Sequence, residues 1–211
     1  MPKITLINDD AKNIKAKADL ILTDPPYDMD GHELAQIIDA IDCQHLVMLT
    51  TMKQLLGFSK HSRYVLNFDF VINAVVPKQS KSIHAPNYTH QTGVYMTKGR
   101  VKTRFNRKLR RRSDTADANG YWPTIIRAPR DRMQDHGLAK NLTAITDLLG
   151  SFEDIETIID PFAGSGTTGL AALELGYDCL MVEQSDEYCT LIRNQFDFLG
   201  INLNQKSLVK N

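Results

Sequence analysis

The chain has 211 residues, 25 Lys and Arg against 25 Asp and Glu, and 42% hydrophobic residues, a composition typical of a globular protein with one domain over residues 1–211. It contains no apolar run long enough to cross a bilayer, and it opens with a short strand-like segment rather than a signal peptide, so we expect a cytoplasmic protein without membrane contact. The three cysteines form no Cys-x-x-Cys pair and the six histidines are scattered, which argues against a disulfide framework and against a metal site.

The first informative segment is an apolar run over residues 18–23 that ends in Asp24-Pro25-Pro26-Tyr27. The run predicts a buried strand, and the two prolines predict a stiff turn with few N–H donors at its tip. Asp24 and both proline carbonyls are then expected to point outward as acceptors, while Tyr27 offers an aromatic face on which a base stacks. This set suits a flat group bearing an NH2, because acceptors on its hydrogens return electron density to the nitrogen. The alternative is an ordinary proline-rich turn.

The middle of the chain alternates between helical and strand patterns. We predict helices over residues 30–41 and 51–59 and strands over residues 45–50, 64–70, 71–76 and 93–97.

Positive charge is concentrated between Lys98 and Arg112, which hold nine basic residues and no acidic one. The rest of the chain keeps 16 basic and 25 acidic residues, a net charge of −9. Such asymmetry indicates a polyanionic partner that is met through one local feature. Alternate basic residues from Lys98 to Arg104 predict a strand with one basic face. The alternative is a solvated hairpin that keeps the protein soluble.

The C-terminal part predicts a strand over 157–160, a glycine turn, a helix over 170–175, a strand over 177–182 and a helix over 186–199. Gly164-x-Gly166-x-x-Gly169 matches a dinucleotide-binding pattern, and Glu183 falls near the position of a ribose-binding acid. Asp160 at the mouth of the turn disfavours a pyrophosphate, and little chain remains for a nicotinamide site. S-adenosylmethionine fits better, since it carries a ribose, an ammonium and a sulfonium but no phosphate.

Asp24-Pro25-Pro26-Tyr27 together with Asp160-Pro161-Phe162-Ala163-Gly164-Ser165-Gly166-Thr167-Thr168 resembles the S-adenosylmethionine-dependent DNA amino-methyltransferases. The order of catalytic tetrapeptide, basic segment and cofactor loop is similar to the beta group of that family. The resemblance implies an α/β, Rossmann-like, mostly parallel and circularly permuted methyltransferase sheet with helices on both faces. In that sheet, the strands over 18–23 and 157–160 are neighbours whose tips open on one crevice. A small basic target-recognition insertion is implied at residues 98–132.

The resemblance also assigns roles to residues. The catalytic group that holds a flipped base comprises Asp24, Pro25, Pro26 and Tyr27. The cofactor group comprises Asp160, Phe162, Ala163, Gly164, Ser165, Gly166, Thr167, Glu183, Lys140 and Asn141. The DNA-binding group comprises Arg100, Lys102, Arg104, Arg107, Arg110, Arg111, Arg112 and Trp122. The segment 136–142 is similar to the family's helix-opening motif, where Lys is usually followed by Pro, and here Asn141 replaces that Pro. For His136 and Lys140, a capping and solubility role is an equal alternative. For Trp122, the alternative is packing of the insertion onto the body of the protein.

The implied activity is methyl transfer from S-adenosylmethionine to an exocyclic amino group in double-stranded DNA after base flipping. Asp24 favours adenine N6 over cytosine N4, which stays the alternative. The short recognition region suggests a small target, a second subunit in a homodimer, or both, and the family implies a bacterial or bacteriophage source. Other open readings are methylation of an RNA base or a protein glutamine, a DNA-binding module with a non-catalytic cofactor pocket, and a dehydrogenase.

Overall fold

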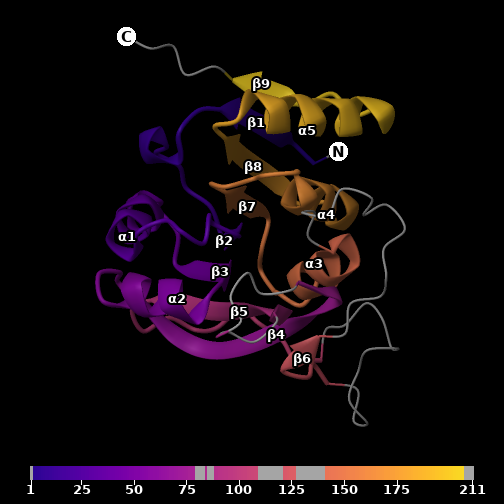
Figure 1. Cartoon of the computed structure of the whole chain (residues 1–211). Helices are drawn as coiled ribbons and strands as arrows, with labels where there is room; N and C mark the ends of the chain where they lie inside the picture. The colour runs from indigo at the N-terminus through magenta and orange to yellow at the C-terminus, as the bar shows by residue number, and fades with distance from the viewer. Residues whose placement is uncertain (1, 79–83, 85–87, 109–120, 127–140, 207–211) are drawn as a thin grey trace.

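The computed structural model describes residues 2–78, 84, 88–108, 121–126 and 141–206. Within these residues, nine strands form one sheet in the order β6-β4-β5-β3-β2-β7-β8-β1-β9 (Figure 1). The strands are β1 (Ile4–Asn8), β2 (Leu20–Thr23), β3 (His45–Thr50), β4 (Tyr64–Lys78), β5 (Tyr88–Lys98), β6 (Ile125–Ile126), β7 (Thr157–Asp160), β8 (Asp178–Glu183) and β9 (Asn204–Lys206).

Most neighbouring strands are parallel. Every pair from β3 through β2, β7, β8 and β1 to β9 is parallel, and β6 is parallel to β4. Only β5 runs the other way among the described strands, since it pairs antiparallel with both β3 and β4. The predicted α/β class with a mostly parallel sheet is confirmed.

Helices cover both faces of this sheet (Figure 1). Side chains alternate between the faces along a strand, so both faces of the central strands must be apolar. Leu20 and Leu22 of β2 pack in the cluster that includes residues of α3, α4 and α5, whereas Ile21 packs in the cluster with α1 and α2. The helices are η1 (Ala11–Asn13), α1 (Gly31–Ala40), α2 (Met52–Ser59), α3 (Leu142–Leu149), α4 (Thr167–Leu175) and α5 (Asp186–Phe198).

Two helices fix the turn that follows β2. Asp30 caps α1, because its carboxylate accepts from the backbone N–H groups of His32 and Glu33 at 2.9 and 3.3 Å. α1 then crosses α2 closely: a Cβ added to Gly31 would lie 2.3 Å from the carbonyl carbon of Gly57. The chain between Thr23 and Asp30 is therefore held at one end by the sheet and at the other by this helix pair.

Several predicted boundaries were wrong. The two strands expected over 64–70 and 71–76 form one strand, β4, whose register shifts between Leu66 and Phe68; residues 64–76 contain no Gly or Pro that would separate two strands. β5 begins at Tyr88 rather than at residue 93 and ends at Lys98. The basic strand expected to continue to Arg104 is absent, because the chain bends at Gly99 and Arg100. The short strands β6 and β9 were not predicted.

Among the described residues, no helix combines the length and the apolar character that a membrane span requires.

Candidate active site

The tetrapeptide 24–27 directly follows the carboxyl end of β2. The Pro26 carbonyl accepts from the side-chain amide of Gln54 at 2.6 Å and from the backbone N–H of Met29 at 3.0 Å. Gln54 is buried in α2, and its own side-chain oxygen accepts from the Thr50 hydroxyl at 2.9 Å. The expectation that both proline carbonyls point outward is therefore wrong for Pro26, because both lone pairs of its carbonyl are already occupied.

Asp24 and Tyr27 share a donor that sequence reasoning missed. The side-chain nitrogen Nε2 of Gln91, in β5, lies 3.1 Å from Asp24 Oδ2 and 2.6 Å from the Tyr27 hydroxyl. The Tyr27 side chain stays partly open, at 49% exposure. Desolvation of its hydroxyl, followed by the negative charge of Asp24, raises the pKa of Tyr27, so the phenol is neutral at physiological pH.

The glycine turn lies between β7 and α4. Gly164 and Gly166 have φ of 53° and 83°, a left-handed conformation that strains any residue with a Cβ. Glu183, at the end of β8, braces this turn: its carboxylate accepts from the backbone N–H of Gly164 and from that of Ser185, both at 2.8 Å. The carboxylate retains lone pairs for further donors, and the predicted role of Glu183 in ribose binding stays a prediction.

Asp160 connects the two predicted motifs. This carboxylate is fully buried, and it accepts from the hydroxyl of Thr23 at 2.8 Å and from that of Thr168 at 2.6 Å. It also accepts from the backbone N–H of Phe162 at 3.1 Å. Thr23 ends β2 and Thr168 belongs to α4, so Asp160 ties the strand of the tetrapeptide to the glycine turn. This geometry favours a positioning role for Asp160 over a direct ligand contact.

The two motifs therefore converge. β2 and β7 pair in parallel, with Leu20 opposite Ile158 and Ile21 opposite Ile159, although 137 positions separate Thr23 from Asp160. Their carboxyl ends meet at one edge of the sheet, where open α/β sheets bind ligands. Asp24, Asp160 and Glu183 all lie at the ends of neighbouring strands of this edge. Such carboxylates favour a cationic ligand over an anionic one.

The remaining residues of the predicted cofactor group fall around the same turn. Phe162 is half-buried and Ala163 is buried. The hydroxyls of Ser165 and Thr167 lie 3.3 Å apart. Asn141 caps α3, because its side-chain oxygen accepts from the backbone N–H of Ala144 at 2.9 Å, and its role in cofactor binding stays a prediction. His136 and Lys140 lie outside the described residues.

No group of three or more His, Cys, Asp or Glu side chains in the described part of the chain is arranged to hold a metal ion.

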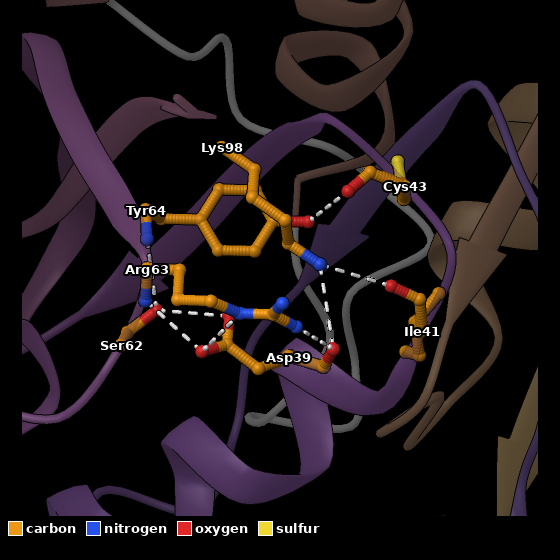
Figure 2. A network of polar contacts seen from close by, with 7 residues as sticks. All are labelled: Asp39, Ile41, Cys43, Ser62, Arg63, Tyr64 and Lys98. Atoms are coloured by element: carbon orange, nitrogen blue, oxygen red, sulfur yellow. Dashed lines mark hydrogen bonds and ion pairs between the residues drawn. The ribbon is translucent and has the colours of Figure 1, made fainter.

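Lys98, the first residue of the basic segment, makes contacts within the protein. The Lys98 ammonium donates to the carbonyls of Asp39 and Ile41, at 3.4 and 3.2 Å, and lies 5.0 Å from the centre of the Tyr64 ring (Figure 2). These carbonyls end α1, where a positive charge is favourable. Burial lowers the pKa of Lys98 from its usual value. Arg63 supports the same helix end through the Asp39 carbonyl at 2.8 Å.

Arg104 also makes internal contacts. Its guanidinium lies 3.3 Å from the Asp19 carboxylate and donates to the Asp154 carbonyl at 2.8 Å. Asp19 precedes β2 whereas Asp24 follows it, so the backbone positions of these two residues are about 16 Å apart at ~3.3 Å per residue, and Arg104 is held at the end of β2 away from the tetrapeptide. This placement favours a structural role for Arg104 over a DNA contact beside the site.

Arg107 and Trp122 are joined by a backbone contact. The backbone N–H of Trp122 donates to the Arg107 carbonyl at 3.1 Å, and the Arg107 guanidinium lies 4.5 Å from the centre of the Tyr121 ring. The Trp122 indole donates to the Ser151 hydroxyl, and its ring centre is 6.1 Å from that of Phe105. These contacts support the alternative in which Trp122 packs the insertion onto the body of the protein.

The other basic residues divide into two groups. Arg100, Lys102 and Arg107 are exposed. Arg110, Arg111 and Arg112 lie outside the described residues, between Arg107 and Trp122 in sequence. The role of both groups as DNA contacts stays a prediction.

The chain belongs to the DNA methylase family of N6 and N4 methyltransferases, whose model matches residues 46–194. A curated relative, the type II methyltransferase M.HinfI of Haemophilus influenzae, is 23% identical over 239 residues, which cover 90% of this chain and 66% of the relative. The chain thus spans slightly less than two thirds of the length of that relative.

Three solved structures share the fold. The M1.HpyAVI–SAM complex has a TM-score of 0.67 at 20% identity and covers 91% of this chain and 99% of its own. A putative DNA modification methylase from Thermus thermophilus, complexed with S-adenosyl-L-methionine, has a TM-score of 0.68 at 17% identity and covers 99% and 100%. The PvuII DNA methyltransferase, described as cytosine-N4-specific, has a TM-score of 0.68 at 13% identity and covers 92% and 89%.

Proposed function

We propose that this protein is an S-adenosylmethionine-dependent DNA methyltransferase that modifies the exocyclic amino group of adenine. The observation that carries the proposal is the convergence of the tetrapeptide with the glycine turn, through parallel β2 and β7 and the hydrogen bond between Thr23 and Asp160. Membership in the DNA methylase family supports it independently.

The residues at the edge of the sheet fit the methyl donor. Glu183 braces the glycine turn and would accept from the ribose hydroxyls with its remaining lone pairs, while the glycines let the backbone approach the ligand closely. The carboxylates at this edge favour the sulfonium charge. When bound, S-adenosylmethionine supplies an electrophilic methyl group on a positively charged sulfur.

Asp24, Pro25 and Tyr27 hold the acceptor base. Asp24 and the Pro25 carbonyl accept the two amino hydrogens of the flipped base, and the ring of Tyr27 stacks on it. The nitrogen lone pair then forms the new N–C bond while the C–S bond breaks and its electrons stay on sulfur. The proton lost from nitrogen goes to Asp24 or to water. Positioning and electrostatics supply the catalysis, without a covalent intermediate on the protein.

Cytosine N4 is the second candidate, because the relatives of similar fold include an enzyme described as cytosine-N4-specific. Asp24 at the head of the tetrapeptide favours adenine by family resemblance. A homodimer, a bacterial or bacteriophage source and a circularly permuted connectivity stay predictions.

The test is incubation of the purified chain with S-adenosylmethionine and DNA from cells that lack DNA methylation, followed by digestion and mass spectrometry of the nucleosides. N6-methyldeoxyadenosine is the expected product. N4-methyldeoxycytidine would replace adenine with the second candidate, and the absence of any methylated nucleoside would refute the proposed activity.

Two substitutions separate the base site from the donor site. Asp24→Ala should abolish methyl transfer and leave the affinity for S-adenosylmethionine within a few-fold, because the carboxylate faces the base. Glu183→Ala should instead weaken the methyl donor in calorimetry and leave DNA affinity unchanged. Unchanged turnover in the first variant, or equal donor affinity in the second, contradicts the corresponding assignment.

A further inference from the structure

Gln91 reaches the tetrapeptide from a strand that does not pair with β2. It belongs to β5, and β3 lies between β5 and β2 in the sheet. The backbone of β5 runs antiparallel to β3, with Thr92 opposite Thr50, so Gln91 lies at the level where β3 ends. Its side chain therefore extends past the end of β3 to the tip of β2. Asp24 and Gln91 are 67 positions apart in the sequence.

One side-chain amide serves both groups of the base site. Gln91 Nε2 lies 3.1 Å from Asp24 Oδ2 and 2.6 Å from the Tyr27 hydroxyl. An amide nitrogen carries two hydrogens, and an ionised carboxylate can only accept. The nitrogen rather than the oxygen of the amide must therefore face Asp24, and the same nitrogen has a second hydrogen for Tyr27.

This arrangement fixes the carboxylate relative to the aromatic ring. A carboxylate with a donor on one oxygen cannot rotate freely about its Cβ–Cγ bond. The ring of Tyr27 is half-exposed, so its hydroxyl end is anchored while part of its surface remains open. A base that stacks on the ring would then present its amino group to a carboxylate at a fixed distance.

We propose that Gln91 is a positioning residue for methyl transfer, which holds Asp24 and Tyr27 in the geometry that accepts the base. The inference rests on the proposed function, because it assigns Gln91 to the same site. Gln91 contributes through Asp24 and Tyr27 and makes no chemical step itself. The competing explanation is that Gln91 only satisfies a half-buried carboxylate and contributes to folding.

The experiment compares Gln91→Leu and Gln91→Glu with the wild type and with Gln36→Glu, a matched control at an exposed position of α1. Initial rates on methylation-free DNA give kcat and the KM for S-adenosylmethionine, and calorimetry of the donor reports whether each variant is folded. We expect Gln91→Leu to lose about 100-fold in kcat, a typical cost of misplacing a catalytic group by about 1 Å. Its KM for the donor should stay within a few-fold, because Glu183 and the glycine turn are untouched.

The pH dependence of kcat in Gln91→Glu distinguishes a positioning role from a purely structural one. Near pH 8 the introduced carboxylate repels Asp24 and cannot donate, so the loss should match that of Gln91→Leu. Its pKa is raised by the neighbouring charge, so near pH 6 the protonated carboxyl becomes a donor and kcat should recover about 10-fold relative to wild type at the same pH. Gln36→Glu should follow the wild type throughout.

The outcomes separate the two claims. If the wild type methylates DNA and the Gln91 variants have kcat values within about two-fold of the wild-type value, the positioning role is overturned. The proposed function then remains intact. A low kcat for Gln91→Glu without recovery at lower pH, in a variant that still binds the donor, also overturns it. A wild type without methyl transfer overturns both.

Discussion

At the residue scale, three carboxylates of one sheet edge have different surroundings and therefore different tasks. Asp160 is fully buried and its oxygens accept from two hydroxyls and one backbone N–H group, so it holds structure together. Glu183 accepts from two backbone N–H groups and braces the glycine turn. Asp24 is only half-buried and is oriented by the amide of Gln91. Asp24 is thus oriented without being fully buried, which fits the proposed contact with the base.

Two substitutions of Tyr27 distinguish whether its ring or its hydroxyl contributes to the proposed methyl transfer. Tyr27→Ala removes both and should lower kcat/KM for DNA by the value of one base stack, about 1–3 kcal/mol or roughly 5- to 150-fold. Tyr27→Phe keeps the ring and loses only the contacts with Gln91 and Asp24, so its loss should be clearly smaller. Steady-state kinetics with DNA as the varied substrate measures both. Equal losses in the two variants would assign the effect to the hydroxyl rather than to stacking.

At the scale of elements, the pair of α1 and α2 supports the turn between β2 and α1. α2 carries Gln54, which holds the Pro26 carbonyl, and α1 starts three residues after Tyr27 at its cap, Asp30. The two helices approach at Gly31 and Gly57. Their packing therefore sets the conformation of the turn between β2 and α1 as well as the stability of the fold.

The two glycines at this crossing give a matched pair of substitutions. A Cβ at residue 31 would lie 2.3 Å from the Gly57 carbonyl carbon and 2.5 Å from the backbone nitrogen of Phe58, and backbone atoms cannot move aside cheaply. Gly31→Ala should therefore lower the free energy of unfolding by about 1–3 kcal/mol. A Cβ at residue 57 would lie 3.4 Å from its nearest neighbour, the Cα of Gly31, which is an ordinary van der Waals contact. Gly57→Ala should therefore be neutral or stabilise α2 by up to about 1 kcal/mol. Urea unfolding measures both, and similar midpoints for the two variants would contradict the close approach.

At the scale of the whole molecule, the basic residues are concentrated in one segment of the sequence, but some of them contact acidic side chains or carbonyl groups of other segments in the fold. The segment 98–112 is rich in basic residues and has no acidic one, yet Lys98 neutralises the end of α1 and Arg104 pairs with Asp19. Burial tends to raise the pKa of Asp19, but hydrogen bonds from Thr157, from the backbone of Glu156 and from Arg104 outweigh it and lower the pKa below its usual value. We therefore expect the phosphate contacts to come mainly from the basic residues beyond Arg104.

This division predicts the salt dependence of DNA binding. Simultaneous replacement of Arg110, Arg111 and Arg112 by Ala should flatten the slope of log K against log salt by up to about 2.7, because each phosphate contact contributes roughly 0.9. Arg104→Ala should leave the slope unchanged and lower stability by up to about 1 kcal/mol, as expected for a partly exposed ion pair. Titrations of a non-specific duplex over a range of salt concentrations measure both slopes. A triple variant with the wild-type slope would exclude the three arginines as phosphate contacts.

Local sequence patterns were enough to predict most of the helices and strands and the two motifs of the candidate site. Apolar periodicity placed β3 over 45–50 and β7 over 157–160, with the bounds that the structure has, and composition at the ends of the strands singled out Asp24, the glycine turn and Glu183. These features are local, so a short window of residues contains the whole signal.

Contacts between these groups, and the polar residues that support them, arise from the fold. Gln91 and Gln54 lack a local signature, since each acts on a turn that is 67 or 28 positions away in the chain. The internal use of Lys98 and Arg104 and the connection of Asp160 to Thr23 likewise depend on neighbours that strand pairing brings together. Strand order and helix packing create these contacts, and they are properties of the folded chain as a whole rather than of any segment of it.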